Sequence, residues 1–165
     1  MTGQRHTRDL IGPLTTLFGE LVHGAPETGA YVLNRGDRGL LASLDRLSAA
    51  AASAARPGGA SIAAHVEHLR YGLSLMNRWA AGEDPFADAR WAASWDRTRV
   101  SDAEWAELRL ALRAEARQWL AALSTPRDAS EIELNGMIGS IVHLAYHLGA
   151  IRQLDRELRG PAAND

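Results

Sequence analysis

The sequence predicts an all-α protein, an up-and-down four-helix bundle with long crossover connections. Apolar residues recur at helical spacing in four long segments, and no segment shows the alternation that is typical of a β-strand. Glycine, proline and turn-forming residues separate the four segments, and three of the segments carry capping signals. Long helices joined by a few long connections are typical of a four-helix bundle.

The length of the chain indicates one domain. Its 165 residues are enough for a single sizeable core. We therefore expect one helical bundle domain over residues 1–165, with residues 1–6 and 160–165 as flexible ends. No apolar run approaches the ~18 residues of a membrane span, and residues 1–12 lack the apolar stretch of an export signal. The sequence thus predicts a cytoplasmic protein with no membrane partner.

The composition restricts the chemistry that the chain can perform. It contains no cysteine, which excludes disulfides, a thiolate nucleophile, Cys-ligated zinc and iron–sulfur clusters. A bound metal would have to be held by His, Asp or Glu. All 18 basic residues are arginine, but the net charge of −2 indicates no general attraction to nucleic acid, and we expect no such partner.

The first helix is expected over residues 7–23. Residues 24–37 contain proline, glycine and the turn-forming NRGD, so they indicate a loop. One or two short helices follow between residues 38 and 55. The apolar stripe of the first helix consists of Leu10, Leu14, Leu17 and Leu21.

The second long helix follows a break at residues 56–61, RPGGAS. Ser61 is a suitable N-cap, and the helix is expected to reach about Ala81 and to end at Gly82. Residues 82–100 show no sustained period. We expect an ordered connection there, with one turn around Trp91–Trp95.

The last two helices have clear limits in the sequence. Ser101 and Glu104 match a capping box at the start of the third helix. STPRDAS then separates it from the fourth helix, expected over about Glu133–Arg159 and closed by Gly160. The buried face of the third helix is expected to consist of Trp105, Leu108, Leu112, Ala116, Trp119 and Leu123.

Four of the six histidines lie on the inner sides of two helices. In VHLAYHLGAIRQL, residues 142–154, steps of about 100° per residue place His143 and His147 on the stripe that Ile151 continues. His65 and His68 lie on the inner flank of the second long helix. The polar residues of that helix form an opposite face that we expect to be solvated, namely Glu67, Arg70, Ser74, Asn77 and Arg78.

Histidines that face a core have a chemical requirement. An unpaired donor or acceptor of a buried imidazole costs about 1–3 kcal/mol, whereas a divalent metal ion accepts a lone pair from each ring. The spacing of His143 and His147 lets both rings reach one ion, and a histidine of the second helix would add a third ligand. A histidine-filled core without a metal is the alternative.

Two segments carry a family resemblance. SIAAHVEHLRYGL at residues 61–73 and IVHLAYHLGAIRQ at residues 141–153 resemble the DinB/YfiT-like superfamily of metal-binding four-helix bundles, and the likeness extends over nearly the whole chain. By position, the resemblance implies His68, His143 and His147 as metal ligands. His65 is the competing first ligand, or else a residue that supports a ligand or lines the pocket.

The resemblance also implies partners and an activity. Its members bind zinc, nickel, iron or manganese, are frequently dimeric, and in several branches use a thiol such as bacillithiol or mycothiol. We therefore expect zinc or nickel first, with iron or manganese next, a homodimer, and a thiol-dependent S-transferase or related metal-dependent hydrolase acting on a small electrophile. The thiol would enter the open position and lose its proton there. The alternative is a stress-associated metal-binding or assembly protein without turnover, and no catalytic residue is identified.

Two tryptophans of the expected connection have two interpretations. Trp91 and Trp95 could cover the mouth of the metal pocket, or they could seal the end of the bundle, which we favour.

Overall fold

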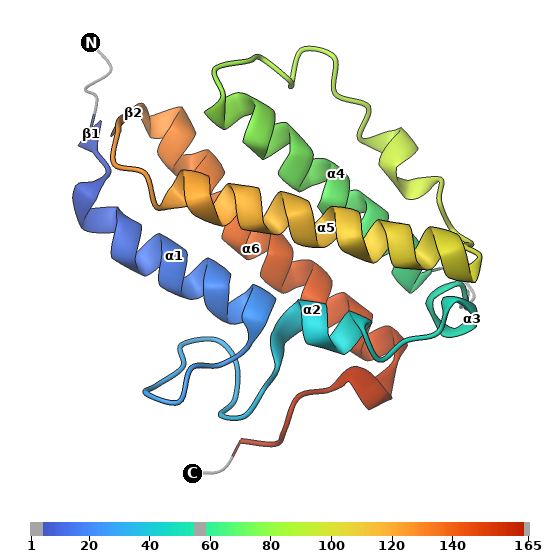
Figure 1. Cartoon of the computed structure of the whole chain (residues 1–165). Helices are drawn as coiled ribbons and strands as arrows, with labels where there is room; N and C mark the ends of the chain where they lie inside the picture. The colour runs from blue at the N-terminus through green and yellow to red at the C-terminus, as the bar shows by residue number, and fades with distance from the viewer. Residues whose placement is uncertain (1–4, 55–58, 164–165) are drawn as a thin grey trace.

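The structure is a computed structural model that describes residues 5–54 and 59–163 (Figure 1). The described residues are mostly helical, as the sequence predicted. Parts of the sequence predictions lie outside the described residues, namely residues 1–4 and 164–165 of the expected flexible ends and residues 55–58 around the expected break before the second long helix. The α-helices are α1 (Arg8–His23), α2 (Gly39–Leu44), α3 (Ala49–Ala52), α4 (Ile62–Ala80), α5 (Asp102–Leu123) and α6 (Glu131–Leu154). The shorter elements are β1 (Arg5–His6), β2 (Asp128–Ala129) and the 3₁₀ helices η1 (Ala92–Trp95) and η2 (Arg156–Leu158).

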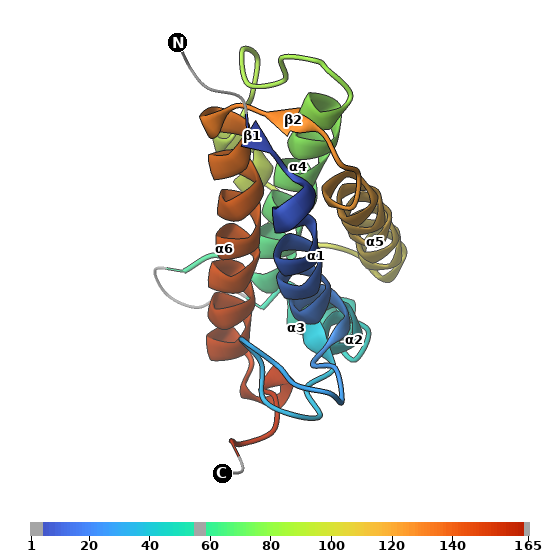
Figure 2. The same ribbon diagram turned by 90° about the vertical axis from the view of Figure 1, so that its left-hand side faces the viewer.

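The four long helices run in two pairs of opposite direction. α4 packs against α5 and α6, and α1 packs against α5 and α6. The antiparallel pair of β1 and β2 brings the starts of α1 and α6 together, and the Ser61 hydroxyl donates to the Thr98 carbonyl (2.7 Å) near the start of α5. Consequently α1 and α6 run one way and α4 and α5 the other (Figure 2). The direction does not alternate between α4 and α5, because the connection returns along α4.

The starts of the long helices follow their capping residues. Ser61 accepts from the backbone N–H of Ala64, and Ser101 forms the predicted capping box with Glu104. A second capping box joins Ser130 to Glu133, so α6 begins at Glu131, two residues before the predicted start.

The end of α6 corrects the predicted limit at Arg159. The helix ends at Leu154, because Asp155 adopts an extended conformation (φ −129°, ψ 110°). The Asp155 carboxylate accepts from the backbone N–H of Glu157 (2.9 Å) and so caps the separate turn η2. The short pair of strands was not predicted either, since two residues are too few to show alternation.

The core is formed by the predicted stripes. Several polar residues are also buried, and two of these exceptions are Asn77 and Glu20. All six residues predicted for the buried face of α5 are buried, and Leu14 and Leu21 of α1 are buried while Leu10 is exposed. Asn77 is buried as well, against the prediction of a solvated face, because its amide donates to the backbone and side chain of Glu115 on α5. The second exception is Glu20 of α1.

Glu20 holds the connection between α1 and α2. Its buried carboxylate accepts from the backbone N–H groups of Tyr31, Val32 and Leu33 at 2.6–3.2 Å. Burial raises the pKa of Glu20, but the three backbone donors lower it more, so the net shift is downward. These backbone N–H groups lie in a loop and have no partner in a helix or strand, so the carboxylate accepts their hydrogen bonds instead.

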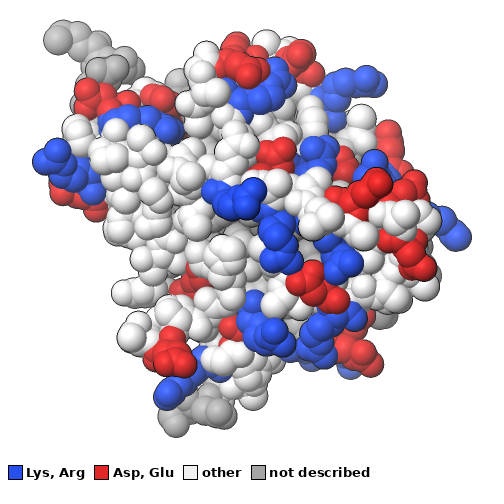
Figure 3. Space-filling view, viewed as in Figure 1, with Lys and Arg blue, Asp and Glu red and all other residues white. Residues whose placement is uncertain are grey.

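The surface carries charges of both signs. On the face shown in Figure 3, acidic and basic side chains are interspersed. Ion pairs join Asp45 to Arg109 and to Arg113. Among the described helices, none is both long and apolar enough to cross a membrane.

Candidate metal centre

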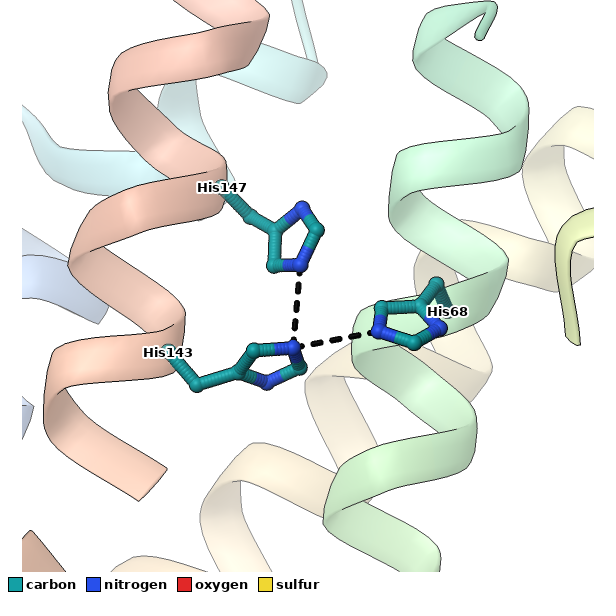
Figure 4. A group of neighbouring side chains, drawn as sticks. All are labelled: His68, His143 and His147. Atoms are coloured by element: carbon teal, nitrogen blue, oxygen red, sulfur yellow. Dashed lines mark hydrogen bonds between the residues drawn. The ribbon is translucent and has the colours of Figure 1, made fainter. Parts of the chain in front are cut away.

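Three histidines converge between α4 and α6 (Figure 4). His143 and His147 lie one turn apart on α6, and His68 reaches toward them from α4. The Nε2 atom of His143 lies 3.1 Å from Nε2 of His68 and 2.9 Å from Nε2 of His147. One ring nitrogen from each histidine lies within 4.8 Å of the other two, so the three rings could hold a single metal ion.

The separations of His143 Nε2 from the other two nitrogens fit a shared ion. Two nitrogens bound at ~2.0–2.1 Å to one ion with angles between 90° and 109° lie ~2.8–3.4 Å apart. The separations of 3.1 Å and 2.9 Å fall in this range. Moreover, His143 Nε2 carries either one proton or one lone pair and faces two other ring nitrogens, so hydrogen bonds within the cluster cannot satisfy all three fully.

His68 is oriented from outside the cluster by Ser94. The Nδ1 atom of His68 lies 2.7 Å from the Ser94 hydroxyl, which itself donates to the carbonyl of Trp91 (2.6 Å). Since the hydroxyl proton is used for Trp91, the direction of the network places a proton on Nδ1 of His68. Its Nε2 then carries a lone pair that faces the other two histidines.

His65 contacts the far side of the cluster. Its Nδ1 lies 2.8 Å from Nδ1 of His147, whereas Nε2 of His147 faces His143. Of the two candidates on α4, His68 therefore has a nitrogen in the cluster of three, and His65 lies against one of its members. One turn of helix separates the two, which is why the sequence left both open.

Burial keeps the four rings neutral. It lowers the pKa of His65 and of His143. Burial and the neighbouring His143 and His65 lower the pKa of His68 to about 4, and burial with the other three histidines lowers that of His147 to about 3. Neutral imidazoles have the free lone pair that a metal ligand needs.

Aromatic rings of the connection cover the cluster. Trp95 stacks on His68 with ring centroids 4.2 Å apart and also contacts His65 and His147. Trp91 lies 5.7 Å from His68 and is 41% exposed. Both tryptophans thus pack against the histidines.

A cavity of about 530 Å³ adjoins the cluster. It lies between α4 and α6, beneath residues of the connection, and its wall includes His143 and Trp91. Gly72 of α4 lies at this point, and a Cβ atom there would contact Trp91 at 3.6 Å and His143 at 3.7 Å. A ligand in the cavity would reach the ring of one of the three histidines.

Ser94 was missed by sequence reasoning. It lies in the connection without periodicity, and only its position between Trp91 and Trp95 could have drawn attention. The remaining histidines lie apart from the cluster: the His6 ring accepts from the backbone N–H of Arg8, and His23 ends α1.

Fold and site together define a mostly helical protein with a three-histidine cluster that could hold a metal ion. Comparison with known protein families, with characterised proteins and with solved structures finds no match to the chain. The resemblance to the DinB/YfiT-like superfamily therefore rests on the residues quoted for it.

Proposed function

We propose that the protein is a DinB/YfiT-like four-helix bundle that binds one divalent ion through His68, His143 and His147. The observation that carries the proposal is the convergence of their three Nε2 atoms. Two of the rings also make a contact through their other nitrogen, Nδ1, which joins His68 to Ser94 and His147 to His65. Such outer contacts are typical of metal-binding histidines, because they fix the ring and its tautomer.

A set of three imidazoles favours zinc or nickel, with iron or manganese as the next candidates. Three protein ligands leave a coordination position for a small molecule. When bound, the ion would supply Lewis acidity, which lowers the pKa of a thiol or water that joins it. The protein's own contribution is to keep the imidazoles neutral and oriented, and to exclude water with Trp95.

The activity that we propose is a thiol-dependent S-transferase or a related metal-dependent hydrolase. Support comes from the cavity beside His143, which offers space for an electrophile next to the proposed ion. The chain has no cysteine, so a sulfur nucleophile would have to come from a low-molecular-weight thiol.

The alternative is a stress-associated metal-binding or assembly protein without turnover. In its favour, Asp84 is the sole carboxylate among the described residues that line the cavity, and the cluster of three possible ligands contains only histidines. A general base beside the proposed ion is therefore not apparent in the described part of the chain.

Metal analysis of the purified protein tests the site. We expect near-stoichiometric metal in the wild type and loss of at least nine-tenths of it in His68→Ala, His143→Ala and His147→Ala. His65→Ala should keep the metal with weaker affinity, and His23→Ala, at the end of α1, is the matched control. Metal that survives all three cluster substitutions would refute the ligand set.

The activity needs a separate experiment. We expect metal-dependent consumption of an electrophile in the presence of bacillithiol, mycothiol or glutathione, and loss of that activity on chelation. Absence of turnover with all three thiols over a broad panel of electrophiles would favour the non-catalytic alternative.

A homodimer is part of the proposal. Three exposed apolar residues follow one another along α6 at intervals of four, namely Ile138, Val142 and Tyr146. An exposed apolar stripe on a long helix is typical of a protein interface. Sedimentation equilibrium should show a dimer that Val142→Asp weakens; a wild-type protein that sediments only as a monomer would contradict it.

A further inference from the structure

The cavity beside His143 has almost entirely apolar walls. α4 contributes Leu69, Leu73 and Met76, and the aromatic rings of Trp79, Phe86 and Trp91 also line the space. Trp79 and Phe86 contact each other edge to face, with centroids 5.5 Å apart, and Trp91 meets Tyr71 in the same way at 5.7 Å. Flat apolar molecules match walls of this kind, because the rings offer both faces and edges for contact.

The polar groups of the wall are few, and most are already used. The Ser140 hydroxyl donates to the Met137 carbonyl and accepts from the indole N–H of Trp119 (2.9 Å). Asp84 is exposed, and His143 belongs to the cluster. Although the chain contains 18 arginines, none is among the described residues that line the cavity. An anionic ligand would thus lose its hydration without gaining a cationic side chain as a partner along these walls.

Three glycines line the cavity. Gly72, Gly136 and Gly139 all lie in the wall. A Cβ atom at Gly136 would collide with the ring of Trp79, so this glycine lets the indole lie against α6. Gly139 has no atom within 4 Å of where its Cβ would be, which places open space directly beside the α6 backbone. A side chain introduced at Gly139 would therefore occupy the cavity without displacing a neighbour.

We propose that this cavity binds the uncharged aromatic part of a small molecule, with its polar end directed toward His143. The volume of about 530 Å³ suits a ligand with one or two fused rings and a short polar group. As an assignment of the electrophile's class, this rests on the proposed function. Binding of the aromatic part itself needs only the walls of the cavity.

Two probes that share a naphthalene ring substituted at the same position test the charge preference. Binding to the full-length protein as purified is measured for neutral 1-naphthalenemethanol and for anionic 1-naphthalenesulfonate, by tryptophan fluorescence. We expect the neutral probe to bind at least ten-fold more tightly than the anion. Equal or tighter binding of the anion, or no binding of the neutral probe up to its solubility, would overturn the proposal.

A matched pair of variants tests the location. Gly139→Leu should weaken binding of the neutral probe at least ten-fold, because its side chain fills the cavity. Gly149→Leu should leave binding unchanged: Gly149 is also an exposed α6 glycine with nothing within 4 Å of its Cβ position, but it lies outside this cavity. Unweakened binding by a folded Gly139→Leu protein would place the probe elsewhere and refute the assignment.

A spectroscopic measurement covers the case in which Gly139→Leu does not fold. In the wild-type protein, the neutral probe should shift the indole N–H resonances of Trp79 and Trp91 and leave that of Trp105, which is bonded to the Leu47 carbonyl, in place. The reverse pattern would refute the assignment. Metal analysis of the same samples separates the two proposals. If the protein contains metal but does not bind the neutral probe, only the proposed ligand class is rejected. If it binds the probe but contains no metal, only the proposed metal site is rejected.

Discussion

Replacement of Ser94 by alanine removes the group that orients His68 and leaves the three clustered histidines in place. In the wild type, the Nδ1–H of His68 donates to the Ser94 hydroxyl over 2.7 Å, at a position where both residues are buried. Without that acceptor the ring can adopt the other tautomer or rotate, and it loses the lone pair directed at His143. Loss of such an outer contact weakens metal affinity by roughly 10–100-fold, which corresponds to about 1.4–2.7 kcal/mol.

The assay is a competition titration with a chromogenic chelator, run on Ser94→Ala and wild-type protein. Ser43→Ala is the control, since Ser43 is also a buried serine but donates to the Gly39 carbonyl, away from the histidines. Ser94→Thr, which keeps the hydroxyl, should retain most of the affinity. Unchanged affinity in a Ser94→Ala protein that folds normally would refute the role assigned to this hydrogen bond.

Three further predictions concern the free energy of unfolding. In chelator-treated protein it should fall as the pH drops from about 6.5 toward 4, because His68 and His147, with pKa values of about 4 and about 3, stay neutral in the folded state while the unfolded chain takes up protons. Each histidine contributes up to ~1.4 kcal/mol per pH unit to this decrease. Urea titrations at pH 7, 6 and 5 measure the slope, and a free energy of unfolding that does not change with pH would contradict the buried neutral cluster. Glu20→Gln should lower the free energy by about 1–3 kcal/mol, since an amide offers one oxygen and no charge to three backbone N–H groups; an unchanged urea midpoint would show that the loop does not need the carboxylate. Ser130→Ala should cost about 0.5–2 kcal/mol through loss of the capping box of α6, and Ser124→Ala, an exposed serine after α5 that caps no helix start, should melt like the wild type.

Patterns among residues close in the sequence were sufficient to predict most of the helices. The buried face of α5 was predicted residue by residue, because a helix whose apolar positions repeat every three or four residues can bury only that face. Ser61 and Ser101 mark the starts of α4 and α5, since their hydroxyl groups satisfy backbone donors within the same turn. Such interactions join residues that are close in the sequence, so the sequence contains the information.

Apart from the limits of α6, which depend on local contacts of Ser130 and Asp155, the errors lie where partners are distant in the sequence. Asn77 resembles a solvated residue until Glu115 is known to lie opposite it. The sequence made no prediction for Glu20, whose partners are the backbone N–H groups of residues 31–33. The directions of α4 and α5 also depend on contacts of the connection, such as that of Ser61 with Thr98. The helical spacing of apolar residues contains no information about such contacts between distant segments.

The sequence by itself determined that the chain is helical and that His143 and His147 lie one turn apart on an inward face, because helical geometry relates residues four positions apart. Only the tertiary structure decided that Nε2 of His68, rather than a nitrogen of His65, enters the cluster. It also decided that Ser94 supports His68, that Trp95 covers the rings and that an apolar cavity opens beside His143. The physical reason is that these contacts depend on how α4, α6 and the connection pack side by side, and the separation and rotation of packed elements are set by all of their side chains together.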